Sequence, residues 1–520
     1  MGSATELYRS QIGGPSVINY SYTDFPWKLV LRDVRYFFVY SWALPWILWP
    51  AFTYGSGELD ELYPTLPNLF CVAIHGLLIV LQLAFLLVLP VAIIFPLWMV
   101  LGAVTAFMLV NWLLCTLLNG PNGTMHSDEK YAKALPQHAH EQWVFINGVA
   151  VGKHWLKNNL NRLAITFKRP VLGIHNRTWG IIFDIVECLI QRNFSYATSD
   201  VRIAYKIVKN ALYDPAKSKV VLILHSQGGI EGGLVLDWLL QEIPQDLLSK
   251  LEIYTFGCAA NHFNNPHRHA VSQKLTRENP SVALGTVVTE TSSVISSDGN
   301  SPVDARRDLG VRIPASPSLP REHSSTLSSS TRTSTLAHDR AIAHIEHYAH
   351  STDFVSIWGV LHFATNRTGS PLIPRFLGRL FVRSTGLGGH QMNQHYLDGM
   401  FPLRRDPVTG ELVGVDEEGN EFMDEVVRLG VEGDAMDNIR EAFDITYAGT
   451  QGFGSGEVST PVEVHGVVTD GGKKLSRRRE VKVRDLSRLW SYRNGMSPQG
   501  SPQLLATEGS VRGLSASQMG

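Results

Sequence analysis

A serine in a sharp turn is the first feature of the sequence that can carry chemistry. The apolar run 220–225 ends in the motif His-Ser-Gln-Gly-Gly at 225–229, and a helical pattern follows over 231–241. A strand, a tight turn and a helix in this order lift a serine hydroxyl above the edge of a sheet, where a base can reach it. The turn also directs the Gln227 amide at an oxyanion formed on a substrate. We therefore predict that Ser226 is a nucleophile and that Gln227 belongs to an oxyanion hole.

A serine hydroxyl is a weak nucleophile until a base, itself oriented by a third group, removes its proton. The strand-like run 344–350 is followed by Asp353, which we predict to be the orienting carboxylate. Its alternative role is the N-cap of the apolar stretch that comes next, because Asp is favoured at that position.

The general base is expected after a further strand-like run, 379–383, in a glycine-rich loop. His390 lies in that loop, just before a helical stretch, and we predict that it is the base. His395 lies one helical turn later, beside Tyr396, and is the alternative base.

A second oxyanion donor is normally supplied by the loop after an earlier strand. The apolar run 143–147 is followed by Gly148 and Val149, so the backbone amide of either residue is the candidate donor. The alternative is a structural turn in which Gly148 is needed only for its backbone conformation.

Short β-rich runs alternate with helix-length amphipathic stretches from about residue 142 to 401, which is typical of a mostly parallel sheet with crossover helices. We predict an α/β fold with such a sheet and flanking helices. The predicted strands are 143–147, 171–175, 220–225, 251–256, 344–350 and 379–383.

The turn at Ser226, with an acid and then a histidine later in the chain, resembles the α/β-hydrolase superfamily, in particular its lipase-like and esterase-like members. The resemblance covers about 142–401. It implies hydrolysis of carboxylic esters by a triad of Ser226, His390 and Asp353, with no cofactor and no metal. Leu224 stands where the usual Gly-x-Ser-x-Gly motif has its first glycine. The resulting crowding favours the alternative function, a catalytically silent α/β-hydrolase fold used as a membrane scaffold.

Membrane segments are predicted before this domain. From 69 to 118 there is no Asp, Glu, Lys or Arg, enough helix for two crossings of a bilayer. Pro90 and Pro96 favour a break between two helices, 69–89 and 93–117. The aromatic run 37–54 is either a third crossing or an interfacial segment. A membrane anchor suggests a lipid acyl ester as the substrate.

The side of the membrane depends on the number of crossings. Lys28, Arg32 and Arg35 place the amino-terminal flank in the cytosol by the positive-inside rule. Three crossings would put the catalytic domain in the lumen, and two would leave it in the cytosol. With only four cysteines in the chain, we favour the cytosolic face of an endomembrane.

The 520 residues thus divide into a polar segment 1–35, a membrane region 36–118 with two or three helices, and a catalytic domain 140–449. A Ser/Thr/Pro-rich insertion at about 280–337 and the tail 450–520 are predicted to be disordered because they carry little apolar surface to bury. Lys plus Arg is 46 and Asp plus Glu is 47, so no excess positive charge favours nucleic acid as a partner.

Overall fold

The fold is described from a computed structural model of the chain. It covers residues 5–8, 24–266, 341–342, 344–365, 376–384, 388–420, 422–429 and 482–498. The chain divides into two compact units, 1–265 with 341–520, and 266–340. Nearly all described residues belong to the first unit, which contains the helices and strands of the described chain. The predicted insertion 280–337 lies outside the described residues.

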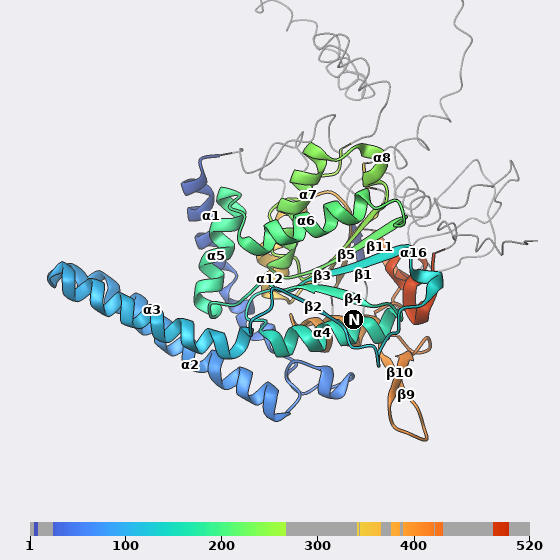
Figure 1. Cartoon of the computed structure of the whole chain (residues 1–520), viewed down its shortest axis with the longest axis horizontal. Coiled ribbons are helices and arrows are strands. Elements are labelled where there is room, and N and C mark those ends of the chain that lie inside the picture. Colours follow the sequence, from blue (N-terminus) through green and yellow to red (C-terminus); the bar gives the residue numbers. More distant parts are fainter. Residues whose placement is uncertain are drawn as a thin grey trace, which may run out of the picture. The chain divides into compact units, whose positions relative to one another are not determined.

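A nine-stranded sheet, in the order β11-β1-β8-β7-β6-β5-β3-β4-β2, forms the centre of this unit (Figure 1). The strands from β4 across to β8 are all parallel to one another. The predicted mostly parallel sheet is confirmed, because each of the predicted runs becomes one of these strands. They are β3 (Glu141–Ile146), β4 (Val171–Ile174), β5 (Lys219–His225), β6 (Leu251–Phe256), β7 (His344–His350) and β8 (Arg379–Arg383).

Three short strands at the two ends of the sheet complete it and were not predicted. β2 (Thr124–His126) pairs antiparallel with β4, and β1 (Thr5–Tyr8) pairs antiparallel with β8. β11 (Val427–Leu429) is parallel to β1. The polar segment 1–35 therefore contributes a strand to the sheet. A separate hairpin is formed by β9 (Leu403–Arg405) and β10 (Leu412–Val415).

Helices cover both faces of the sheet, as expected for parallel strands that are apolar on both sides. Trp143, Phe145 and Val221 belong to a core that includes α4 (Lys153–Phe167). The alternate positions Val144 and Leu222 belong to a second core. It includes residues of α5 (Ile181–Phe194), α6 (Ser199–Tyr213) and α7 (Gly228–Glu242). Shorter helical elements are η3 (Gly57–Leu59), η5 (Pro136–His138), α8 (Gln245–Leu248), α12 (Phe354–Ser356), η7 (Ile357–Leu361), α13 (His362–Thr365), η8 (Met392–Leu397) and α14 (Asp398–Met400).

Part of the carboxy-terminal tail is folded into the core, so the prediction of a disordered tail is wrong for residues 482–498. α16 (Val483–Leu486) and η9 (Leu489–Gly495) bury Leu489 and Tyr492 against the same sheet face as α4. The reason is a short cluster of apolar and aromatic side chains, which offsets the entropy of ordering the segment. The rest of the predicted tail lies outside the described residues.

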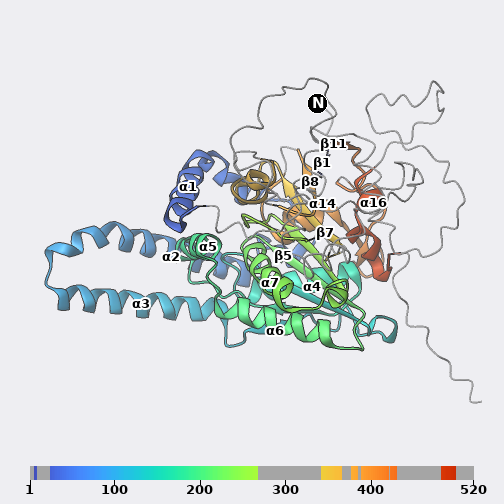
Figure 2. The ribbon, with the colours of Figure 1, turned by 90° about the horizontal axis from the view of Figure 1, so that it is seen from above.

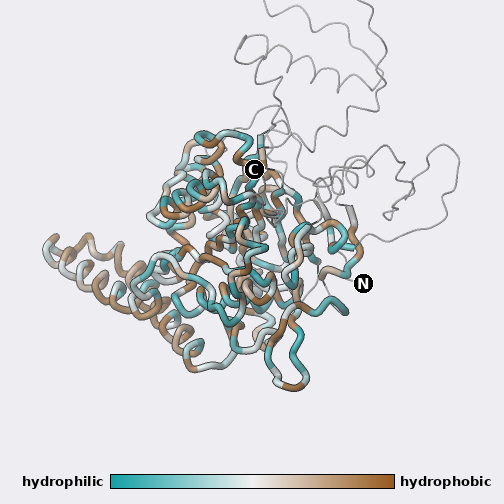
Figure 3. The backbone as a smooth tube through the Cα atoms, turned by 45° about the vertical axis from the view of Figure 1, so that its right-hand side comes forward, coloured by the Kyte–Doolittle hydropathy of each residue, from teal (hydrophilic) through white to brown (hydrophobic). Residues whose placement is uncertain are grey.

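Two long apolar helices lie between β1 and β2 in the sequence, and both were predicted. α2 (Leu66–Val88) continues into the 3₁₀ turn η4 (Leu89–Ile94), and α3 (Leu97–Asn119) returns beside it. Both helices are long and apolar enough to cross a membrane. Pro90 lies in η4 and Pro96 directly before α3, at the predicted break. The hairpin projects away from the sheet (Figure 2), and its residues are mostly hydrophobic (Figure 3).

The segment 37–54 forms no single helix long enough to cross a membrane, so the structure gives no support to a third crossing there. α1 (Pro26–Val39) is followed by a 3₁₀ helix, η2 (Ser41–Ile47), which contains Pro45. Phe37 and Leu44 pack against the second core, and Ala43 is buried in it. Pro45 interrupts regular helical bonding. Other apolar side chains of the segment, Phe38, Trp42 and Phe52 among them, stay exposed.

Candidate active site

Ser226 occupies the turn between β5 and α7 in a left-handed backbone conformation, with φ of +56°. Residues other than glycine rarely adopt this backbone conformation, and it persists only where surrounding contacts enforce it. Here the Ser226 amide donates to Phe256 O at 3.0 Å, and Ser226 O accepts from the Gly229 and Ala259 amides at 3.0 and 3.1 Å. The predicted sharp turn is therefore present at Ser226, which is only 3% exposed.

Three glycines allow the chain to pack closely around this turn. A Cβ atom at Gly228 would lie 2.5 Å from Ile146 O, and one at Gly148 would collide with the Ser226 side chain. At Gly229 a Cβ would collide with Cys258 Sγ. Gly148 is therefore needed for close approach to Ser226.

The crowding expected from Leu224 is relieved by a fourth glycine that sequence reasoning missed. Leu224 is fully buried, and its side chain occupies the space where a Cβ of Gly232 would be. Gly232 lies one helical turn after Gly228 in α7. A second glycine pair at 232–233, shortly after the motif, was the available signal.

His390 connects Ser226 to Asp353. The distance from His390 Nε2 to Ser226 Oγ is 2.9 Å, and that from His390 Nδ1 to Asp353 Oδ2 is also 2.9 Å. An ionised carboxylate only accepts hydrogen bonds, so Nδ1 carries the proton and Nε2 of the neutral ring is the acceptor for the serine hydroxyl. The structure thus brings the three predicted residues into one hydrogen-bonded row.

Asp353 fills both of the roles considered for it. Its Oδ1 accepts from the Val355 amide at 2.8 Å, which makes it the N-cap of α12. Its Oδ2 accepts from Ser356 Oγ at 2.9 Å and Tyr396 OH at 2.7 Å as well as from His390. Burial alone would raise the pKa of Asp353, but the His390 charge and these hydrogen bonds lower it to about 2. The carboxyl group is therefore ionised and held in one orientation.

His395, the alternative base, is engaged elsewhere. Its Nδ1 accepts from the Gln391 amide at 2.9 Å, and its Nε2 donates to Pro50 O at 3.0 Å. Burial lowers the pKa of His395 to about 4, so the ring is neutral near pH 7. Both nitrogens are occupied, and the structure brings His390 rather than His395 to Ser226.

His225, directly before the serine, supports the loop that carries His390. Its Nε2 donates to His390 O at 2.9 Å, and the two rings stack with centroids 4.8 Å apart. Burial, together with the His390 charge, lowers the pKa of His225 to about 3. A neutral ring in this place positions His390 without adding charge beside it. Sequence reasoning assigned His225 no role, although it is part of the motif.

The predicted oxyanion donors lie at the same sheet edge as Ser226. β3 and β5 are adjacent and parallel, with Ile146 opposite Leu224, so Gly148 and Ser226 follow neighbouring strand ends. Asn147 fixes the turn, because its Nδ2 donates to Gly148 O at 3.0 Å and to Asn176 O at 2.9 Å. Within the described part of the chain, the amides of Gly148, Val149 and Gln227 have no hydrogen-bond acceptor. This edge is also a point where the strand order reverses, the usual place for ligands in open α/β sheets.

The Gln227 side chain is bound to α5. Its Nε2 donates to Glu187 Oε1 at 3.1 Å and to Gln191 Oε1 at 3.0 Å. Burial raises the pKa of Glu187 to about 7, and the Asp184 and Asp200 charges act in the same direction. A carboxyl group that titrates near neutral pH thus lies next to the residue after the serine.

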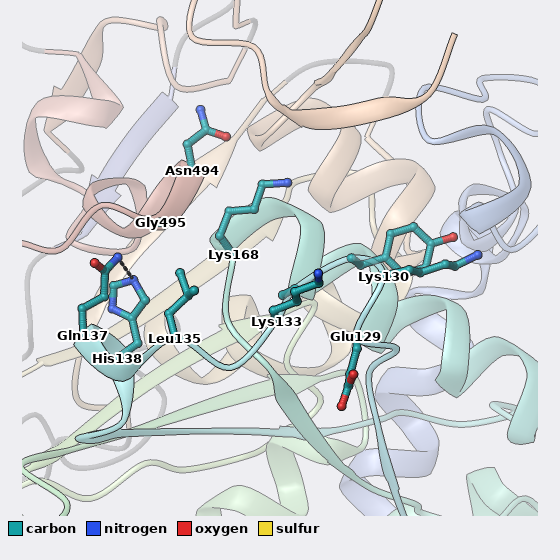
Figure 4. A pocket seen from close by; sticks show the side chains of 11 residues that line it. Glu129, Lys130, Lys133, Leu135, Gln137, His138, Lys168, Asn494 and Gly495 are labelled. Atoms are coloured by element: carbon teal, nitrogen blue, oxygen red, sulfur yellow. Dashed lines mark hydrogen bonds between the residues drawn. The ribbon is translucent and has the colours of Figure 1, made fainter. Parts of the chain in front are cut away.

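A cavity of about 400 Å³ lies at the other edge of the sheet (Figure 4). Its lining comes from the segment before β3, from the end of α4 and from η9, including Lys130, Lys133 and Lys168. Since β3 and β5 are parallel and Ser226 follows β5, this cavity is at the amino edge and Ser226 at the carboxyl edge. The cavity is therefore separate from the site formed by Ser226, His390 and Asp353.

In the described ranges, no group of three or more His, Cys, Asp or Glu side chains is placed to hold a metal ion. No protein-family model matches the chain, and neither a curated protein nor a solved structure matches it. The chemistry therefore has to be inferred from the geometry around Ser226.

Proposed function

We propose that the chain is a membrane-anchored serine hydrolase with an α/β-hydrolase-type fold, which cleaves carboxylic esters. The observation that carries the proposal is the row Asp353–His390–Ser226, with both hydrogen bonds at 2.9 Å and the serine in a strained turn after β5. Serine, base and orienting acid in this geometry and chain order recur in α/β-hydrolases.

The reaction proceeds in two halves. Ser226 Oγ attacks the ester carbonyl while His390 Nε2 takes its proton, and the ionised Asp353 stabilises the imidazolium. The amides of Gln227 and of Gly148 or Val149 stabilise the oxyanion of the tetrahedral intermediate. His390 then gives its proton to the leaving alcohol oxygen. Water, deprotonated by His390, attacks the acyl-enzyme, and the acid leaves as Ser226 regains its proton.

Two observations support a lipid acyl ester as the substrate class. The α2–α3 hairpin is long and apolar enough to anchor the protein in a membrane, where such esters are concentrated. The segment after α1, which exposes the apolar side chains of Trp42 and Leu48, contacts the loop of His390, since Gln391 Nε2 donates to Ile47 O at 3.1 Å.

A catalytically silent scaffold was favoured only by the crowding expected from Leu224. Because Gly232 accommodates the Leu224 side chain, that reason is removed.

We place the catalytic domain on the cytosolic face of an endomembrane. Lys28, Arg32 and Arg35 lie on α1, and basic residues beside membrane segments favour the cytosol. α1 is joined to the domain, since Arg192 Nε binds Asp33 Oδ2 at 2.8 Å, so the two lie on one side of the membrane.

A fluorophosphonate probe tests the proposal most directly, because it labels only an activated serine. The full-length protein in detergent or vesicles should be labelled, and Ser226→Ala should not. The variant should keep its melting temperature, since a serine hydroxyl at a turn contributes no more than about 1 kcal/mol. Equal labelling of both proteins would reject Ser226 as the nucleophile, and no labelling of the folded wild type would favour the scaffold.

A further inference from the structure

The distal half of the α2–α3 hairpin is apolar on every side. Between residues 83 and 104, no side chain carries a charge, amide or hydroxyl group, and the Trp98 indole is the one polar handle. Ile93, near the tip, is 91% exposed, and Leu97 and Trp98 are exposed as well. A turn that emerged into water on the far side of a bilayer would leave these side chains solvated at a cost of about 25 cal/mol per Å². The tip is therefore suited to hydrocarbon.

The proximal half is tied to the catalytic domain by buried polar groups. Gln82 Nε2 donates to Asn111 Oδ1 at 2.8 Å and to Trp179 O at 2.6 Å, which joins both helices to the turn before α5. Nearer the domain, Asn119 Nδ2 donates to Thr178 O at 2.8 Å. Exposed apolar side chains occur in this half as well, Leu69 and Leu117 among them. The base of the hairpin thus stays with the protein.

The free part of the hairpin is too short to cross a bilayer. From Gln82 to Ile94 the chain makes α-helix up to Val88 and then the 3₁₀ turn η4. At about 1.5 and 2.0 Å per residue this reaches roughly 20 Å, against about 30 Å for the hydrocarbon core. At the base, the exposed Lys153 lies beside Gly120, which keeps that end near water. The tip passes the middle of a bilayer but does not reach its far side.

Two further helices present apolar stripes to solvent. On α1 the stripe is Trp27, Leu31 and Phe38, at helical spacing, and all three are exposed. On α5 it is Val186, Ile190 and Phe194, spaced four residues apart. Exposed apolar stripes of this kind are typical of helices that lie in a membrane interface.

The stripes and the hairpin occupy one flank of the domain. α5 is bound to α1 through Arg192 and Asp33, and its first turn follows Trp179, which accepts from Gln82 of the hairpin. Both views place α1, α5 and the base of the hairpin side by side (Figure 1, Figure 2). Arg32 and Arg35, exposed on α1, suit anionic headgroups at the same level.

We propose that the hairpin enters one leaflet from the side of the catalytic domain and turns back within the hydrocarbon, while α1 and α5 lie on the surface of that leaflet. The occupant of this apolar flank is thus a lipid bilayer. The inference rests on the membrane anchorage in the proposed function and is independent of the chemistry of Ser226.

This arrangement places the leaflet next to the loop that carries His390, the proposed general base. The segment after α1 contacts the loop of His390, since Gln391 Nε2 donates to Ile47 O at 3.1 Å and His395 Nε2 donates to Pro50 O at 3.0 Å. An acyl ester that leaves the leaflet beside η2 therefore meets the loop that carries the base.

Cysteine accessibility tests how deep the hairpin reaches. Ile93→Cys and Val408→Cys replace side chains that are both 91% exposed, one at the hairpin tip and one in the β9–β10 hairpin. In sealed vesicles, a membrane-impermeant maleimide should label Val408→Cys from one side and Ile93→Cys from neither. Both should react after denaturation, and the wild type, whose four cysteines are buried, sets the background. Labelling of Ile93→Cys from either side of intact vesicles overturns the proposal.

Fluorescence quenching tests the surface helices without any use of activity. Bimane attached to Leu31→Cys or Ile190→Cys should be quenched by nitroxides on lipid headgroups in phosphatidylcholine–phosphatidylserine vesicles. The same label at Val408→Cys should not be, because that site faces water. If Leu31→Cys and Ile190→Cys behave like Val408→Cys, α1 and α5 do not lie on the leaflet. Fluorophosphonate labelling of the same samples reports separately on Ser226, so the two proposals fail independently.

Discussion

Two buried carboxylates, Asp353 and Glu252, lie at opposite edges of the sheet and have different hydrogen-bonding partners. Asp353 follows β7 at the carboxyl edge, and Glu252 is the second residue of β6, at the amino edge. Burial alone would raise the pKa of each, but the pKa of both is lowered. For Glu252 the charges of Arg488 and Lys219 are responsible, with Arg488 Nη2 at 2.9 Å.

The difference lies in what each partner can do. Glu252 meets a guanidinium that stays protonated, and its neighbours at this edge are paired in the same way, as with Glu141 and Arg169 at 2.8 Å. Asp353 meets an imidazole, a group that can accept and donate a proton during a reaction, and the other ring nitrogen reaches Ser226 Oγ. A lowered pKa in a buried carboxyl group therefore does not by itself point to catalysis, and the proposal for Ser226 rests on the imidazole that joins it to Asp353.

The largest expected effect, on the rate of ester hydrolysis, comes from removing His390 at the carboxyl edge of the sheet. His390→Ala should reduce ester hydrolysis by about 10³-fold or more, as much as Ser226→Ala, because members of one triad act as a unit. His395→Ala is the matched control and should be much milder, since His395 contacts Pro50 and Gln391 rather than Ser226. Initial rates on a short soluble ester measure both. If His395→Ala is the more damaging variant, the base has been misassigned.

Removing the cation beside Glu252 at the amino edge of the sheet should instead affect stability. Arg488→Met leaves Glu252 buried without its closest cation and should lower the free energy of unfolding by about 3–5 kcal/mol. Arg484→Met, in the same carboxy-terminal segment, removes a partly exposed pair with Asp424 and should change it by less than about 1 kcal/mol. Denaturant unfolding of both variants gives the comparison. Fluorophosphonate labelling of folded Arg488→Met should match the wild type, and a selective loss of labelling would show that the amino edge takes part in the chemistry.

The parallel strands were predictable because they are buried and rich in β-branched and aromatic residues, and β5 in particular contains the continuous apolar run 220–224. The strands β1, β2 and β11 are short and partly polar, so nothing local distinguishes them from loops. The segment 482–498 was missed for a related reason. Arg488 suggests a solvated tail until its partner Glu252, far away in the sequence, is known.

Much of the candidate site could be predicted because its signals are local or follow chain order. The turn at Ser226 is contained in ten residues, and Asp353 and His390 follow suitable strands. The choice between His390 and His395 could not be made, because the atom that engages His395 is Pro50 O, from a distant segment. The accommodation of Leu224 was within reach, since Gly232 stands one helical turn beyond the motif.

Gly232 provides a test of how the turn tolerates Leu224. Gly232→Ala should lower the free energy of unfolding by about 1–3 kcal/mol, because the new Cβ collides with the Leu224 side chain. Gly233→Ala is the control on the same helix, where a Cβ would lie 3.3 Å from His262 O, and its effect should be smaller. Thermal unfolding measures both. Combining Gly232→Ala with Leu224→Ala should cost less than the sum of the single changes, and strict additivity would show that the two residues do not compete for space.

The smallest expected effect concerns Glu187, which binds the side chain of Gln227. Its raised pKa of about 7 makes the stability of the protein depend on pH. The folded state holds this proton more tightly than the unfolded chain, whose pKa is near 4.5. The stabilising contribution of the protonated group is therefore fully present below pH 4.5 and is lost as the pH rises through 7.

Glu187→Gln removes this titration and keeps an oxygen for the Gln227 side chain. The variant should match the wild type near pH 4 and be more stable by about 1–2 kcal/mol at pH 8, a value discounted from roughly 1.4 kcal/mol per pKa unit because the group is partly solvated. Urea unfolding at the two pH values measures the difference. Glu242→Gln, at the exposed end of α7, is the control and should show no comparable pH dependence. A Glu187→Gln variant that is equally shifted at both pH values, or less stable at pH 8, would mean that Glu187 is ionised in the folded protein at neutral pH.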